Sequence, residues 1–231
     1  MKRLLLMLSL FIIVSTAQAQ RFRVGVVAGA AITDIAGADL VDNDNDFVKA
    51  GLIVGGLVNT KIGATTQMQL EISFIQRGSQ VLPDTLHMND YYIMNLNYIN
   101  VSLQVRQPIH ININRKMSDK YGLIFGLTYG SLLSYSYTIQ SVSYTADLSN
   151  NDANAFFGFY YNFTPNFFFD MRYSNSFIPV IKRDGYNQSF YPWFNSWNAG
   201  DNMAFELRLG YIFGTGAGKG NAPAPDATPA Q

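Results

Sequence analysis

The run from Asn202 to Phe213 alternates between large apolar residues and small or polar ones, with Ile212 as the exception. This period of two is typical of a β-strand with one apolar face and one polar face. At about 3.4 Å per residue, the run extends roughly 40 Å, which is enough to cross a bilayer even when the strand is tilted. Strands of soluble proteins usually have only about five or six residues. The run therefore favours a membrane-spanning strand.

The same alternation recurs along the chain and predicts eight strands separated by segments rich in Gly, Pro, Asn, Asp and Ser. The connections after the first, third, fifth and seventh strands are longer than the others, as in outer-membrane barrels with an even number of strands. We therefore expect an all-β fold, an eight-stranded antiparallel up-and-down transmembrane β-barrel. The predicted strands are Arg21–Thr33, Val48–Asn59, Thr66–Ser79, Leu96–Gln107, Tyr121–Tyr137, Ala153–Phe163, Phe167–Phe177 and Asn202–Phe213.

The first 19 residues have the pattern of a secretory signal peptide. Two basic residues precede an apolar run at Leu4–Val14, and Ala17-Gln18-Ala19 supplies small residues for cleavage. An N-terminal membrane anchor is the alternative, but the apolar run is short for a span. We expect residues 20–213 to form the barrel domain and residues 214–231, rich in Gly, Ala and Pro, to form a disordered periplasmic tail.

Composition narrows the class of protein further. Charged residues make up only 14% of the chain, while 17 Phe and 14 Tyr are present. No apolar run after the signal approaches the 18 residues of a spanning helix. The mature chain has 14 basic and 16 acidic residues after Lys2 and Arg3 are removed, so we expect no nucleic-acid partner. Cysteine is absent, which excludes a disulfide framework.

The polar faces of the predicted strands carry mostly Gly, Ser, Asn, Thr and Gln with few charges, which suits a crowded barrel interior. A soluble lipocalin-like barrel would instead present polar faces rich in Lys and Glu to water. We therefore expect the apolar faces to contact outer-membrane lipid, with aromatic girdles at both ends of the span. The girdle residues would be Phe22, Tyr121, Phe163, Phe167, Tyr211 and Phe213 at the periplasmic end and Phe74, Tyr135, Tyr137 and Phe177 at the other.

Several segments resemble the PorT-like outer-membrane β-barrel family of Bacteroidetes bacteria. The resemblance rests on G-V-V-A-G-A-A-I-T-D from Gly25, Q-L-E-I-S-F-I-Q-R-G-S from Gln69, L-N-Y-I-N-V-S-L-Q-V-R from Leu96, G-L-T-Y-G-S-L-L from Gly126, and the terminal L-R-L-G-Y-I-F. It covers the mature chain, although Asn100 and Ser102 replace an acid and a proline of the usual third motif. The resemblance implies an outer-membrane barrel, and a role in type IX protein secretion for one subgroup.

Metal-binding and catalytic patterns are weak in this sequence. Asp42-Asn43-Asp44-Asn45-Asp46 begins like a calcium loop but lacks the following glycine and the glutamate at the twelfth position, so a solvated acidic loop is favoured. His87 and His110 fall in predicted connections on opposite sides of the membrane and cannot share a zinc ion. No nucleophile motif is present. We therefore expect no enzyme, no cofactor and no metal.

Eight charged residues fall on the predicted inner face. We expect them to form an ion-pair and hydrogen-bond network that fills the lumen, because unpaired buried charges are costly and eight strands leave little room. A narrow ion path is the alternative. These residues are Arg23, Lys49, Glu71, Arg106, Asp170, Arg172, Glu206 and Arg208.

A second candidate site is the long connection before the last strand. Dense exposed aromatics there would provide a surface for a protein partner; alternatively, they pack on the barrel mouth or anchor at lipid headgroups. The residues are Tyr186, Phe190, Tyr191, Trp193, Phe194 and Trp197. We thus expect a structural or interaction protein of the outer membrane with both termini in the periplasm, inserted by the barrel-assembly machinery. A type IX secretion component and a small channel are the alternatives.

Overall fold

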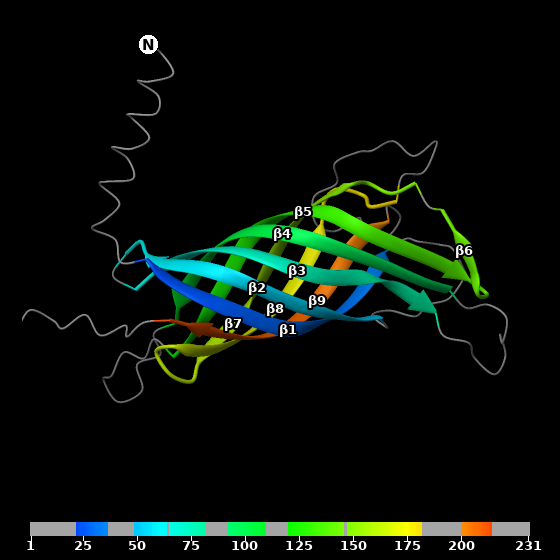
Figure 1. Ribbon diagram of the computed structural model, residues 1–231. Coiled ribbons are helices and arrows are strands. Elements are labelled where there is room, and N and C mark those ends of the chain that lie inside the picture. The colour runs from blue at the N-terminus through cyan, green and yellow to red at the C-terminus, as the bar shows by residue number, and fades with distance from the viewer. Residues whose placement is uncertain are drawn as a thin grey trace, which may run out of the picture.

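The computed structural model describes residues 22–36, 49–63, 65–81, 92–109, 120–145, 147–181 and 200–213 of the 231-residue chain. These residues form one antiparallel sheet that closes into a barrel (Figure 1). No helix among them is long and apolar enough to span a membrane. The strands are β1 (Arg23–Ala36), β2 (Lys49–Lys61), β3 (Gln67–Val81), β4 (Tyr92–Pro108), β5 (Tyr121–Ile139), β6 (Val142–Tyr144), β7 (Asn151–Asn162), β8 (Phe167–Ser176) and β9 (Asp201–Ile212).

Eight of these strands form the barrel wall. Neighbouring strands pair in sequence order, β9 pairs with β1 from Ile212–Gly25 to Asp201–Ala36, and β5 passes directly to β7. The prediction of an eight-stranded antiparallel up-and-down barrel is confirmed. Closure removes the unpaired strand edges that a lipid environment could not satisfy. We call the end where β1 begins and β9 finishes the near end, and the opposite end the far end.

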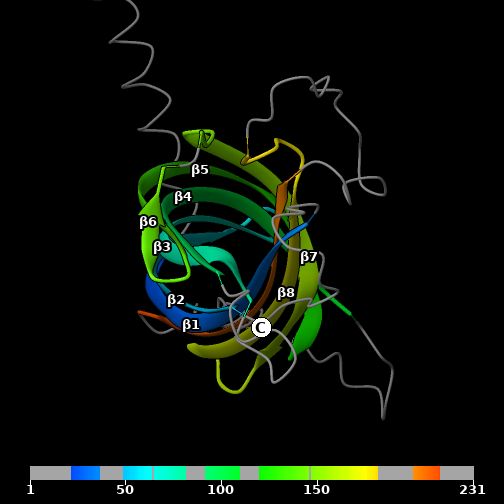
Figure 2. The same ribbon diagram turned by 90° about the vertical axis from the view of Figure 1, so that its right-hand side faces the viewer.

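The short strand β6 lies outside the wall and was not predicted. It pairs only with the last residues of β5, from Tyr137–Tyr144 to Ile139–Val142. The turn between them uses positive φ angles at Gln140 (47°) and Ser141 (67°), as two-residue hairpin turns require. The end of β5 and β6 extend past the neighbouring strands at the far end (Figure 1), and Figure 2 shows the barrel viewed from that end. The structure therefore carries a small sheet extension at the far end.

The outer face of the wall is apolar and exposed, as the alternation predicts. Exposed large side chains follow every barrel strand, including Val24, Leu52, Ile72, Leu103, Leu127, Phe159 and Leu209. At the near end, aromatic rings contact one another in the pairs Tyr161–Phe163, Phe163–Phe167 and Tyr211–Phe213, with centroids 5.1, 5.3 and 5.4 Å apart. This surface has the apolar band and aromatic girdle of a barrel in lipid.

A β-bulge in β5 corrects one part of the predicted outer face. The register with β4 pairs Tyr98 with Leu132 but Asn97 with Ser134, so Leu133 is an extra residue. Because side chains alternate with a period of two, one extra residue exchanges the faces of everything that follows. The prediction that Tyr137 belongs to the outer girdle is therefore wrong, because its side chain is only 8% exposed and packs inside the barrel.

The bulge has the opposite effect on the serines of the same segment. Ser134 and Ser136 share the sequence parity of the lumen-facing Thr128, yet they lie on the outer surface and accept hydrogen bonds from Asn97 (3.0 Å) and Asn95 (2.9 Å). This polar pairing interrupts the apolar band. We infer that the lipid-facing part of β4 and β5 ends there and that the segments beyond it project past the membrane.

Candidate functional site

The lumen brings together six of the eight predicted inward charges. Alternation places each of them on the inner face of its strand, and each is almost completely buried. The six are Glu71 on β3, Arg106 on β4, Asp170 and Arg172 on β8, and Glu206 and Arg208 on β9. A buried charge of this kind is stable only when opposite charges and hydrogen bonds surround it.

Asp170 is the acid with the most arginine contacts. Arg172 donates two hydrogen bonds to this carboxylate, from Nε to one oxygen at 3.1 Å and from Nη2 to the other at 3.0 Å. The guanidinium groups of Arg106 and Arg208 each approach the same carboxylate to 3.6 Å. The negative charge of Asp170 is therefore shared among three arginines.

Glu71 and Glu206 connect these residues across the lumen. Glu71 accepts a hydrogen bond from Arg208 and lies 3.6 Å from Arg172. Glu206 accepts a 3.4 Å hydrogen bond from Arg208. Arg208 therefore contacts three carboxylates from β3, β8 and β9, and it holds strands together that are distant in sequence.

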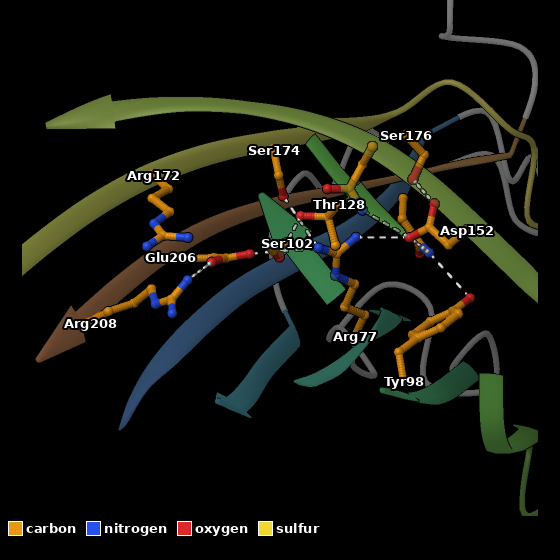
Figure 3. Close-up of polar contacts among 12 residues, drawn as sticks. Arg77, Tyr98, Ser102, Thr128, Asp152, Arg172, Ser174, Ser176, Glu206 and Arg208 are labelled. Carbon is orange, nitrogen blue, oxygen red and sulfur yellow. Dashed lines mark hydrogen bonds and ion pairs between the residues drawn. The ribbon is translucent and has the colours of Figure 1, made fainter. Parts of the chain in front are cut away.

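Arg77 and Asp152 also belong to this cluster of buried charges, although neither was predicted from the sequence (Figure 3). Arg77 donates to Asp152 at 3.0 Å and lies 3.6 Å from Glu206. Asp152 also accepts hydrogen bonds from Ser176, Asn154 and Asn202. Arg77 shares the parity of Glu71, so the alternation of β3 could have identified it. Asp152 was missed because β7 begins at Asn151, two residues before the predicted strand.

Arg23 and Lys49 face inward but stand apart from this cluster, which corrects the predicted network. The register pairs Glu206 with Ala31 and Arg208 with Gly29, so Arg23 lies farther toward the near end. There Arg23 donates to Asn59 at 3.0 Å. Lys49 pairs with Thr33 in the register of β1 and β2, toward the far end. Neither makes an ion pair within the part of the chain that the structure describes.

We call the eight connected residues the lumen charge network. Its four arginines and four acids balance in charge, and the void that its members enclose with their neighbours holds about 10 Å³. Such a space takes about one water molecule. The members are Glu71, Arg77, Arg106, Asp152, Asp170, Arg172, Glu206 and Arg208.

Apolar clusters flank the network toward both ends of the lumen. The far half holds a cluster that was not predicted: Ala31, Ile35, Ile53, Ile75, Tyr92, Met94, Leu96, Tyr98, Tyr137, Leu148 and Val180. Toward the near end lie two smaller clusters, Val27, Leu57, Phe168 and Ile212 in one and Ile124, Phe156 and Tyr160 in the other. These layers keep bulk water from the charges, which strengthens the ion pairs and raises the penalty for breaking them.

Near-end packing depends on Gly210 of β9. A β-carbon at this position would overlap the ring of Phe168. That ring in turn lies 4.4 Å from the guanidinium carbon of Arg106, a cation–π contact. Changing Gly210 to valine should displace the ring and lower the free energy of unfolding by about 1 to 3 kcal/mol, as overpacking does. Urea titration of the folded barrel in lipid vesicles measures this, and a Gly63→Val variant in the β2–β3 turn, where a β-carbon meets only ordinary contacts, is the control.

Several predicted residues lie outside the described part of the chain. They include the aromatic connection with Tyr186, Phe190, Tyr191, Trp193, Phe194 and Trp197, the acidic run Asp42–Asp46, and His87 and His110. Among the residues that the structure does describe, no three His, Asp or Glu side chains are placed to hold a metal ion.

A closed wall, an apolar outer face and a lumen filled by side chains around a central charge network define a membrane-spanning β-barrel protein. The chain belongs to the family described as "Outer membrane protein beta-barrel domain", which matches residues 16–182. It is thus a β-barrel protein of the outer membrane. No curated protein matches the chain.

Solved structures with a similar backbone fold include Neisserial surface protein A. Its sequence is 12% identical, the match covers 83% of this chain and 97% of that chain, and the TM-score is 0.47. The attachment invasion locus protein Ail of Yersinia pestis has 14% identity, 83% and 98% coverage and a TM-score of 0.47. The outer membrane protein OprG of Pseudomonas aeruginosa has 11% identity, 85% and 98% coverage and a TM-score of 0.44.

Proposed function

We propose that this protein is a non-enzymatic outer-membrane barrel that acts as a structural or interaction protein through the connections at its far end. The observation that carries the proposal is the filled lumen, in which a charge-balanced network encloses a void of only about 10 Å³. Among the described residues this interior leaves no open path for a solute, so binding to partners would use the surfaces at the ends of the barrel.

The proposed orientation follows the usual arrangement of outer-membrane barrels, with short periplasmic turns and longer outer connections. Residues 1–19 would be a signal peptide, the near end would face the periplasm, and residues 214–231 would be a periplasmic tail. The β5–β6 extension at the far end would then project from the cell surface. Assembly into the membrane would use the barrel-assembly machinery.

The aromatic connection is the surface that we propose for a protein partner. Affinity capture from outer membranes tests this, with the six aromatics of residues 186–197 either intact or changed to serine. A control variant changes Asn187, Ser189 and Asn195 to alanine. A partner retained by the wild type and the control but lost with the serine variant supports the interaction role. Identical captures from all three proteins would defeat it.

Type IX protein secretion is the second candidate, because the motifs at Gln69 and Leu96 resemble the PorT-like family. Deleting the gene should then block export of secretion cargo while leaving other outer-membrane proteins in place. Normal cargo export in the deletion strain would exclude this role. A small channel is the third candidate, and conductance measurements distinguish it from the proposed role.

A further inference from the structure

The near end of the barrel opens into a basic vestibule, which we define by Arg23, Lys61, Arg106 and Lys120. These four cations come from β1, β2, β4 and the residue preceding β5, so they approach the space from different sides. The cavity holds about 310 Å³, at the lower end of the roughly 300 to 1,000 Å³ of ligand sites. The turn Asn162–Asn166 completes its rim.

Two of the vestibule cations, Arg23 and Lys61, have no acidic partner among the described residues. No acidic side chain is among the described residues that line it. Arg23 donates to the neutral amide of Asn59, and neither Arg23 nor Lys61 makes an ion pair with a described residue. The acids of the lumen charge network are already matched by its own arginines. Arg23 and Lys61 therefore give the described part of the vestibule an excess of positive charge.

Arg106 forms the floor of the vestibule and is held rigidly there. Its side chain is almost fully buried, with the guanidinium carbon 4.3 Å from the Tyr160 ring centroid and 4.4 Å from that of Phe168. Its Nη1 has no hydrogen-bond partner among the described residues, but this atom lies 3.6 Å from Asp170, a carboxylate of the lumen charge network. Arg106 therefore forms a fixed floor of the vestibule, while its charge is matched within the network.

We propose that the basic vestibule binds an anionic phosphate group. Arginine and lysine form their strongest hydrogen bonds with ionised oxygens, and a phosphate presents acceptors in several directions at once. Cations that converge from different sides of a cavity match that geometry better than the flat, two-oxygen edge of a carboxylate. The phosphate can belong to a soluble phosphate compound or to the headgroup of a phospholipid at the membrane edge.

Two probes distinguish these sources in the full-length protein purified in an uncharged maltoside detergent. Titration calorimetry with inorganic phosphate tests the soluble source. Native mass spectrometry after incubation with phosphatidylglycerol tests the lipid source. The variant Arg23→Gln/Lys61→Gln removes two vestibule cations without touching the lumen charge network, and Lys49→Gln removes a cation toward the far end as the control.

The double variant should bind inorganic phosphate about ten-fold more weakly than the wild type, while Lys49→Gln keeps its affinity. If instead only the phosphatidylglycerol adduct is lost in the double variant, the site takes its phosphate from lipid. The proposal is overturned if neither probe separates the double variant from the wild type, or if Lys49→Gln weakens binding as strongly. Heat-modifiability on gels verifies that all three proteins are folded.

Discussion

Changing Arg208 to leucine should lower the free energy of unfolding of the barrel by about 3 to 5 kcal/mol. The guanidinium group contacts Glu71, Asp170 and Glu206, all of them buried. Its removal leaves these carboxylates short of one cation in a lumen that admits hardly any water. Heat-modifiability on gels and urea titration in lipid vesicles both measure the loss. An unchanged melting temperature would contradict the role of the network.

Two further variants separate the network from a general effect of losing an arginine. Arg23→Leu removes an inward-facing arginine that has no acidic partner among the described residues, so it should cost far less than Arg208→Leu. The pair Arg208→Leu/Glu71→Leu restores the charge balance of the remaining network. It should therefore be more stable than Arg208→Leu alone, because breaking a buried pair costs more than replacing both partners.

The alternation of the sequence predicts most of the barrel. In a regular strand, odd-numbered and even-numbered residues face opposite sides, so the apolar set indicates the lipid side and the polar set the lumen. Glu71, Asp170 and Arg208 were placed correctly because each lies within a regular run. Arg23 was assigned wrongly to the network because parity says which face a residue occupies but not how far along the barrel it lies. That position depends on the register between strands, which no single strand reveals.

The far half of the barrel was predictable to a smaller extent. Ser131 and Leu132 interrupt the alternation of β5, but Leu133, Tyr135 and Tyr137 continue its earlier parity, so the run was interpreted as one regular strand. The residues Tyr92, Met94 and Leu96 carry apolar side chains on the face that is polar elsewhere in β4, and they pack inside the barrel. An apolar segment of the lumen cannot be distinguished from a lipid-facing segment by hydropathy alone.

Changing Tyr137 to alanine should have the second large effect. The bulge at Leu133 pairs Tyr137 with Met94, and both side chains are buried in the apolar cluster of the far half. Alanine leaves a cavity beside Tyr92, whose ring centroid lies 6.4 Å from that of Tyr137. We expect the far end to lose about 3 to 5 kcal/mol of local stability, as for other large buried aromatic side chains replaced by alanine.

Limited proteolysis and hydrogen exchange of the far end of β4 and β5 measure this change. Leu133→Ser is the matched control, because Leu133 is 59% exposed and its side chain is not part of the buried cluster. The control should behave almost like the wild type. If Tyr137→Ala is protected as well as the control, the bulge does not place Tyr137 in the packed interior of the far end.

The filled lumen is the central claim, because the proposed role at the surfaces of the barrel depends on it. Planar-bilayer recording with the purified, full-length protein tests it most directly. The account predicts no stable single-channel conductance at any applied voltage that the bilayer withstands. A reproducible open conductance from the wild-type protein would contradict the filled lumen and would favour the small channel instead.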